Sequence, residues 1–205
     1  FKEIVTGGSY GRLFMLDAMM DECLKGYLTG WTRRKETLGG GVFFSSSPHM
    51  LDVMLWIGGA VRCASVVGTH GGCSIEGEDT ACSILKFENG VIGVTRHTWA
   101  SPSAPTWYTM EAVCEQPRIR LTTSPEGDLF RDGPECAWTT RIEAHGAHDE
   151  VLLESGEGLD LTAEVEHFFD CVDTGACPQT DGRVARKMIE LVLNAYADAE
   201  QRGGL

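Results

Sequence analysis

The chain has 205 residues, 42% of them hydrophobic and 23% charged, a composition typical of a globular domain large enough to bury a core. A formal net charge of −13 leaves no basic surface for phosphates, so we expect no nucleic-acid partner. No apolar run approaches the roughly 20 residues of a membrane span, so we expect no membrane partner either.

The chain opens with a helical or linker segment at residues 1–6, a glycine-rich turn at 7–11 and a strand from Arg12 to Met20. The turn formally matches Gly-x-Ser-x-Gly, the nucleophile elbow of serine hydrolases. That elbow needs earlier strands to build its oxyanion hole, and too few residues precede the turn to form them. We therefore set the serine-hydrolase interpretation aside.

Residues 38–59 carry the clearest start and stop signals of the chain. Three glycines, a short apolar run and three serines lead to Ser47 as a helix N-cap, Pro48 as the first helical residue and a closing glycine pair. His49 then lies in the first turn, where the helix dipole favours a neutral imidazole suited to proton transfer. A polar residue that only completes the cap is the alternative. Apolar residues at helical spacing predict one buried face: Met50, Val53, Met54 and Ile57.

Strands separated by turns follow this helix. Asp79–Phe87 and Val91–Trp99 form a hairpin across an Asn-Gly turn. Other strands are predicted at Val61–Thr69, Thr106–Cys114, Arg118–Thr123, Trp138–Ile142 and Val151–Leu153. So many turn signals with few helices between them indicate a meandering antiparallel sheet, not a doubly wound parallel one.

Two helices close the chain. In the first, which Asp160 or Thr162 caps and Thr174-Gly175 ends, apolar residues at i, i+3, i+4 and i+7 predict a packed face: Val165, Phe168, Phe169 and Val172. Asp181 caps the second and Gly203 ends it. Its apolar stripe consists of Met188, Leu191, Val192, Ala195 and Ala199.

Three stretches resemble the C-terminal domain of the glucose-fructose oxidoreductase / inositol dehydrogenase / MocA (Gfo/Idh/MocA) family. They are the Gly-Gly-Gly to His segment at 39–49, the hairpin from Asp79-Thr80 to Thr98-Trp99, and the tail with its Thr-Gly-x-x-Pro at 174–178. The resemblance implies an α+β fold, a large and predominantly antiparallel open sheet with helices packed on one face, as in dihydrodipicolinate reductase. Residues 1–205 would form a single C-terminal substrate-binding and oligomerisation domain.

The same resemblance implies an NAD(P)-dependent oxidoreductase acting on a hydroxyl of a sugar, cyclitol or related polyol. NAD or NADP would be bound by an N-terminal Rossmann domain, which this chain does not contain; no Gly-x-Gly-x-x-Gly occurs in it, and we expect no cofactor site. The chain alone is expected to be inactive. Its partners would be the polyol substrate, its own Rossmann domain, and further copies in a homodimer or homotetramer joined through the sheet.

His49 occupies the histidine position of the family, and Ser45 stands where the family has an aspartate. Serine does not ionise near neutral pH and cannot stabilise an imidazolium as a carboxylate does. We predict His49 and its hydrogen-bonding neighbour Ser45 as the catalytic residues. The resemblance implies substrate-binding roles for Trp31, Arg33, Arg34, Arg96 and Tyr108. Successive strand residues face opposite ways, so Arg96 and His97 cannot both face the substrate, and the sequence leaves open which does.

Two alternatives remain open. The serine at position 45 favours a catalytically decayed module that only associates with itself. A metal-binding hydrolase is suggested by the ligand-like spacings of His70 with Cys73 and of His145 with His148 and Asp149, but each group is too small for a zinc site, so we expect no metal. Eight cysteines without a Cys-x-x-Cys pair favour free, buried thiols in a reducing cytoplasm.

Overall fold

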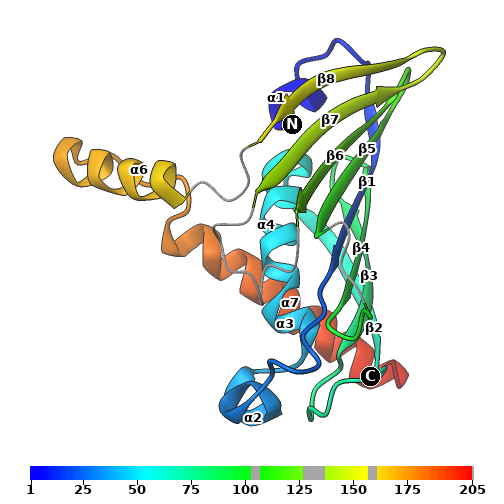
Figure 1. Cartoon of the computed structure of the whole chain (residues 1–205), viewed down its shortest axis with the longest axis vertical. Coiled ribbons are helices and arrows are strands. Elements are labelled where there is room, and N and C mark those ends of the chain that lie inside the picture. The colour runs from blue at the N-terminus through cyan, green and yellow to red at the C-terminus, as the bar shows by residue number, and fades with distance from the viewer. Residues whose placement is uncertain (103–106, 127–136, 157–160, 205) are drawn as a thin grey trace.

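The computed structural model describes residues 1–102, 107–126, 137–156 and 161–204, which form one open sheet with helices on one side (Figure 1). The strands are β1 (Leu13–Asp21), β2 (Val61–Thr69), β3 (Thr80–Phe87), β4 (Ile92–Thr98), β5 (Tyr108–Cys114), β6 (Arg118–Pro125), β7 (Trp138–His145) and β8 (Asp149–Ser155). The helices are α1 (Lys2–Thr6), the 3-10 turn η1 (Gly30–Arg33), α2 (Lys35–Leu38), α3 (Val42–Ser45), α4 (Ser47–Gly58), α6 (Leu161–Thr174) and α7 (Gly182–Arg202).

The strand order is β2-β3-β4-β1-β5-β6-β7-β8, and every neighbouring pair is antiparallel except β1 with β4. The prediction of a large, predominantly antiparallel open sheet with helices on one face is therefore confirmed. It is not a simple meander, because β1 lies between β4 and β5. The last two strands are longer than predicted.

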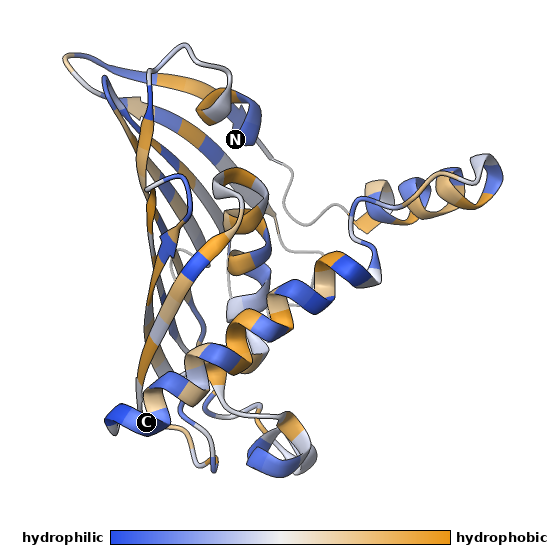
Figure 2. Cartoon of the chain, turned by 180° about the vertical axis from the view of Figure 1, so that it is seen from behind, coloured by the Kyte–Doolittle hydropathy of each residue, from blue (hydrophilic) through white to orange (hydrophobic). Residues whose placement is uncertain are grey.

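The two faces of the sheet differ in what covers them. On β1, Leu16, Ala18 and Met20 are buried toward the helices, and the alternate residues face the open side. Helix α7 packs on β2 and α4, and Figure 2 shows hydrophobic and hydrophilic residues alternating along it. Its predicted caps and stripe are confirmed: Asp181 accepts hydrogen bonds from the N–H groups of Arg183 and Val184.

Helix α4 has the predicted buried face, with Met50 and Met54 in the core, but its N-terminus differs from the prediction. Ser46 takes the N-cap position, and the Ser47 hydroxyl donates back to the carbonyl of Phe43 instead of capping the helix. The reason is that the apolar run before the serines is itself helical: α3 leads into α4 through Ser46, whose φ of −96° and ψ of −34° are helical.

The glycine triplet lies where two backbone segments cross. A Cβ on Gly41 would stand 2.0 Å from the carbonyl oxygen of Glu78, and one on Gly77 would stand 2.2 Å from that of Gly40. The Val42 N–H donates to the Glu78 carbonyl at 2.7 Å across this crossing. The glycines therefore allow backbone contact, and they do not form a phosphate-binding loop.

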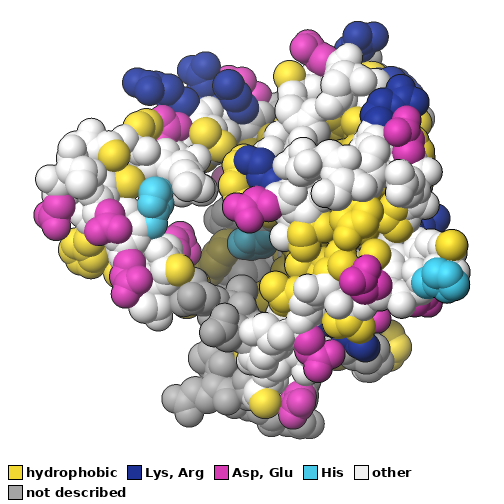
Figure 3. All heavy atoms as spheres, turned by 90° about the horizontal axis from the view of Figure 1, so that it is seen from above, with side chains coloured by type: hydrophobic (Ala, Val, Ile, Leu, Met, Phe, Trp, Pro, Cys, Tyr) yellow, Lys and Arg dark blue, Asp and Glu magenta, His cyan; other side chains and the backbone are white. Residues whose placement is uncertain are grey.

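Helix α6 contradicts its predicted packing. Val165, Phe168, Phe169 and Val172 are 52%, 57%, 59% and 62% exposed, and α6 projects away from the sheet (Figures 1 and 3). The pattern predicted an apolar face correctly, but no described element covers that face. The helix begins at Leu161, so Thr162 is within it and is not its cap; the alternative cap, Asp160, lies outside the described residues.

Within the described parts of the chain, no helix is both long and apolar enough to cross a bilayer. The cysteines described there are all free, as predicted. The expectation that they are buried is wrong for three of them, Cys63, Cys82 and Cys177, which are exposed. Cys136 lies outside the described residues.

Candidate functional site

His49 is exposed in the first turn of α4, on the helix-covered side of the sheet. Its backbone N–H donates to the carbonyl of Ser46 at 3.3 Å. Ser45 lies one helical turn earlier, which puts the two predicted catalytic residues on the same side of the helical segment. An exposed imidazole is available for proton exchange with a bound molecule.

A buried carboxylate lies beneath this turn. Glu22 directly follows β1, is 6% exposed, and accepts hydrogen bonds at Oε2 from the Ser46 hydroxyl (2.8 Å) and from Trp99 Nε1 (3.0 Å). Trp99 Nε1 also donates to the Ser46 hydroxyl at 2.8 Å. Ser46 thus joins Glu22 to the same turn that carries His49.

Strand register brings further polar side chains to this place. Met20 pairs with His97 on β4 and with Tyr108 on β5, so all three side chains lie in one row on the helix-covered face. Glu22 lies two residues after Met20, and Trp99 lies two residues after His97, so both continue the same alternation of side chains toward the helices. The Glu22 N–H donates to the Thr98 carbonyl at 2.8 Å. A polar cluster therefore closes the ends of β1, β4 and β5.

Burial sets the protonation states of this cluster. It raises the pKa of Glu22, while hydrogen bonds from Ser46 and Trp99 and the nearby His49 lower that pKa in part. Burial lowers the pKa of His97 to about 3, and His49 adds to that shift. Burial also raises the pKa of Tyr108 to about 12. His97 and Tyr108 are therefore neutral near pH 7.

Of the predicted substrate-binding residues, Tyr108 lies in this cluster and Arg96 does not. Arg96 pairs with Met19 on the open face of the sheet, and its guanidinium is 3.6 Å from Asp21 Oδ2. His97, its neighbour, faces the helices. The question that the sequence left open is decided by register, and Arg96 is on the wrong face to reach a molecule beside His49.

Trp31, Arg33 and Arg34 lie in the η1–α2 segment, at the foot of the view in Figure 1. Trp31 is 63% exposed, and Arg33 Nε donates to the Leu28 carbonyl at 2.7 Å. Within the described residues, no hydrogen bond or ion pair joins this segment to His49 or Glu22. Two residues of the cluster, Glu22 and Ser46, were missed. Glu22 could have been found, because the buried alternation of Ala18 and Met20 extends to it.

The ligand-like spacings have structural explanations. The Asp79 carboxylate accepts hydrogen bonds from the N–H groups of Gly71, Gly72 and Cys73 at 2.6–2.8 Å. Burial by itself raises the pKa of Asp79, but these hydrogen bonds and one from Thr80 lower it below its ordinary value. His145 and Asp149 face each other across the β7–β8 turn at 3.3 Å. Among the described residues, no group of three or more His, Cys, Asp or Glu could hold a metal.

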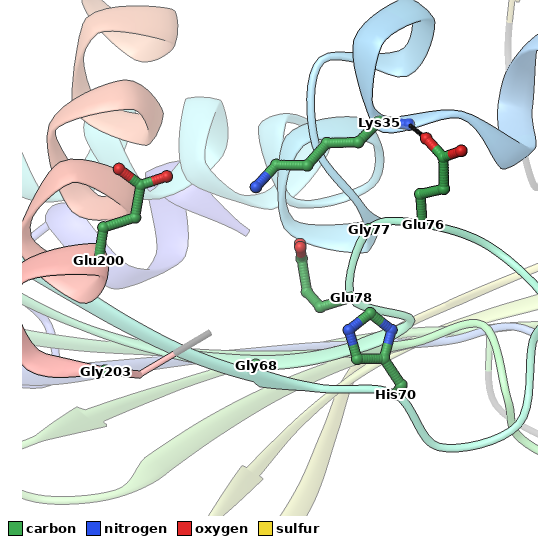
Figure 4. A pocket seen from close by; sticks show the side chains of 8 residues that line it. All are labelled: Lys35, Gly68, His70, Glu76, Gly77, Glu78, Glu200 and Gly203. Atoms are coloured by element: carbon green, nitrogen blue, oxygen red, sulfur yellow. Dashed lines mark hydrogen bonds between the residues drawn. The ribbon is translucent and has the colours of Figure 1, made fainter.

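A cavity of about 360 Å³ lies apart from this cluster, between α2, the β2–β3 connection and the end of α7 (Figure 4). Three glutamates line it, and two of them have structural partners. Glu78 Oε1 accepts from Tyr196 OH (2.7 Å) and from the Phe43 N–H (3.0 Å), and Glu76 accepts from the Lys35 N–H at 2.9 Å. None of the predicted site residues lines this cavity.

Comparison with known proteins gives a consistent result. Residues 1–120 match the family model described as the GFO/IDH/MocA C-terminal domain. The chain is 27% identical over 157 residues to D-apiose dehydrogenase of Paraburkholderia graminis. This match covers 75% of the chain and 41% of that dehydrogenase. It is 29% identical over 190 residues to 1-carboxy-3-chloro-3,4-dihydroxycyclohexa-1,5-diene dehydrogenase of Comamonas testosteroni. This match covers 80% of the chain and 47% of that dehydrogenase. The chain thus spans less than half the length of either relative.

Solved structures of oxidoreductases share the fold. The crystal structure of an oxidoreductase from Agrobacterium radiobacter in complex with NAD+, L-tartaric acid and magnesium superposes with a TM-score of 0.77. The match covers 97% of the chain and 58% of that protein at 19% identity. At this identity the likeness concerns the fold alone.

Proposed function

Since the chain belongs to the GFO/IDH/MocA family, we propose that it is the substrate-binding part of an NAD(P)-dependent oxidoreductase acting on a hydroxyl of a sugar, cyclitol or related polyol. The names of both curated relatives support this proposal, because each is a dehydrogenase and each name describes a hydroxylated compound. The observation that carries it is the exposed His49, in the family-matched segment, beside a buried polar cluster.

His49 is the proton-handling residue in this proposal. When a carbinol is oxidised to a carbonyl, the carbon loses a hydride and the oxygen loses a proton, and a neutral imidazole can accept that proton. Ser45 contributes only a hydrogen bond. The glycine triplet does not offer a cradle for the dinucleotide phosphates, because the crossing backbone of Gly77 and Glu78 fills the space beside it. In this proposal the hydride acceptor is held outside the chain.

The test uses the protein expressed from the complete gene and follows NAD(P)H formation with a panel of neutral polyols. We expect His49→Gln to lower kcat/KM for the best substrate by about 100-fold or more, the usual loss when an acid–base group is removed. His148→Gln, at an exposed position in the β7–β8 turn, is the matched control and should keep full activity. Equal rates for wild type and His49→Gln would contradict the role of His49.

The alternative is a module that has lost its chemistry and only self-associates, which Ser45 favours. The same assay separates the two: a complete protein that oxidises no polyol, yet forms oligomers, would support the alternative.

We also propose that copies of the chain associate through the open sheet face. Val67, Ile84 and Ile92 are 58%, 61% and 41% exposed on β2, β3 and β4. Val67 pairs with Cys82 on β3, and Ile84 pairs with Val94 on β4. Because paired residues lie on the same side of a sheet, Val67 and Ile84 lie on the open face. Contiguous exposed apolar side chains on a sheet face are typical of a protein–protein contact.

We expect Ile84→Lys to shift the chain toward the 22.3 kDa monomer in sedimentation velocity, because a buried lysine without a partner disfavours the contact. Leu193→Lys is the matched control, since Leu193 is 50% exposed on α7, on the helix-covered side. Unchanged sedimentation of Ile84→Lys, or dissociation by Leu193→Lys alone, would locate the contact elsewhere.

A further inference from the structure

Two side chains of this region, His97 and Trp107, carry buried polar atoms without a hydrogen-bond partner among the described residues. His97 is 0% exposed, and neither of its ring nitrogens has a hydrogen-bond partner there. The indole N–H of Trp107 is also buried without a partner. It approaches the carboxylate of Glu22 but does not reach hydrogen-bond geometry. Native proteins pair almost all buried polar atoms, so these atoms indicate a molecule that supplies the missing partners.

The carboxylate of Glu22 is fixed in place and carries no cationic partner. Ser46 and Trp99 both donate to Oε2, which holds the side chain against the turn of His49. Among the described residues, no lysine or arginine forms an ion pair with Glu22. His49 is an ionisable side chain whose charge lowers the pKa of Glu22, and it also lowers the pKa of His97.

We propose that Glu22, His97 and Trp107 form a hydroxyl-binding subsite beneath His49, and that Glu22 makes this subsite selective for uncharged polyols over sugar acids. The inference rests on the proposed function and specifies the substrate class of the same site. Neither the family match nor the relatives assign a role to these residues.

The donors and acceptors of the three side chains match a pair of neighbouring hydroxyl groups. Trp107 can only donate, a carboxylate can only accept, and a neutral histidine donates from one nitrogen and accepts at the other. Each hydroxyl donates one hydrogen bond and accepts others, so a diol can satisfy all of these atoms. A ligand carboxylate or phosphate has no proton to donate to Glu22, and wherever Glu22 is ionised the two like charges would repel each other with no cation between them.

The test records the side-chain 15N–1H signals of Trp107 and the ring signals of His97 while the chain is titrated with D-xylose or with D-xylonate. We expect D-xylose to move both sets of signals saturably, and D-xylonate to bind at least tenfold more weakly. The Nε1–H signal of Trp56, which is 58% exposed, is the internal control and should not move. In Glu22→Gln, the difference between the two ligands should fall to less than threefold, and in His97→Leu binding of D-xylose should weaken at least tenfold.

Three results would overturn the inference: neither ligand moves the signals, D-xylonate binds as tightly as D-xylose, or Glu22→Gln preserves the full selectivity. The fold of each variant is checked from its dispersed amide spectrum, so loss of structure is recognised separately. The proposed function has its own test in the oxidation assay. A complete protein that oxidises polyols while this titration fails would reject the subsite and keep the function.

Discussion

Gly41→Ala is expected to destabilise the chain by roughly 4 kcal/mol or more, or to prevent folding, because overlap with backbone cannot be relieved by moving a side chain. The new Cβ would stand 2.0 Å from the carbonyl oxygen and 2.5 Å from the nitrogen of Glu78. Relief would require separating α3 from the start of β3, and with it the hydrogen bond from the Val42 N–H to the Glu78 carbonyl. Urea unfolding followed by circular dichroism measures the loss.

Gly182→Ala is the matched control. A Cβ at Gly182 meets nothing within 4 Å, and the residue is the first of helix α7. Alanine forms helix better than glycine by up to about 1 kcal/mol, so this variant should be as stable as wild type or slightly more stable. A Gly41→Ala protein with wild-type stability would show that the two backbone segments do not cross as described.

The second large effect concerns pH and His97. Folding lowers the pKa of this residue from 6.5 to about 3 by burial. Between these two values the unfolded chain binds a proton at His97 that the folded chain does not, so acid favours unfolding. The contribution of His97 is fully present above pH 6.5 and is lost as the pH falls toward 3. It should change the free energy of unfolding by about 1.4 kcal/mol per pH unit, and by roughly 5 kcal/mol over the whole window.

His97→Leu should remove this dependence. We expect the variant to gain stability relative to wild type as the pH is lowered, measured as the difference in urea unfolding free energy at each pH. His148→Leu, at an exposed position, should follow the wild-type profile. Parallel profiles for wild type and His97→Leu between pH 6.5 and 4 would mean that His97 is protonated in the folded chain.

Local chemistry made much of this fold predictable. The strands could be predicted because apolar and polar residues alternate between turn signals. The caps of α7 could be predicted because Asp181 and Gly203 lie at the ends of an apolar stripe. These signals depend on neighbours within a few residues. The family resemblance, which the match over residues 1–120 confirms, added the sheet architecture and the position of His49.

Other features depend on partners far away in the chain. The amphipathic pattern of α6 states that one face is apolar, but not which surface covers it, and the described residues leave that face exposed. Alternation requires Arg96 and His97 to face opposite ways, but only the pairing of β4 with β1 decides that His97 faces the helices. Ser47 was misread as a cap because the helical geometry of α3 depends on its packing against β3 and β4.

The amino-acid sequence by itself determined most of the strands and helices and the segment that carries His49, because propensity, periodicity and capping act over short distances. Only the tertiary structure decided that β1 enters between β4 and β5 and runs parallel to β4. That insertion joins Glu22 to Trp99 and aligns Met20 with His97 and Tyr108. The polar cluster beneath His49 exists because of long-range strand pairing, which no local pattern encodes.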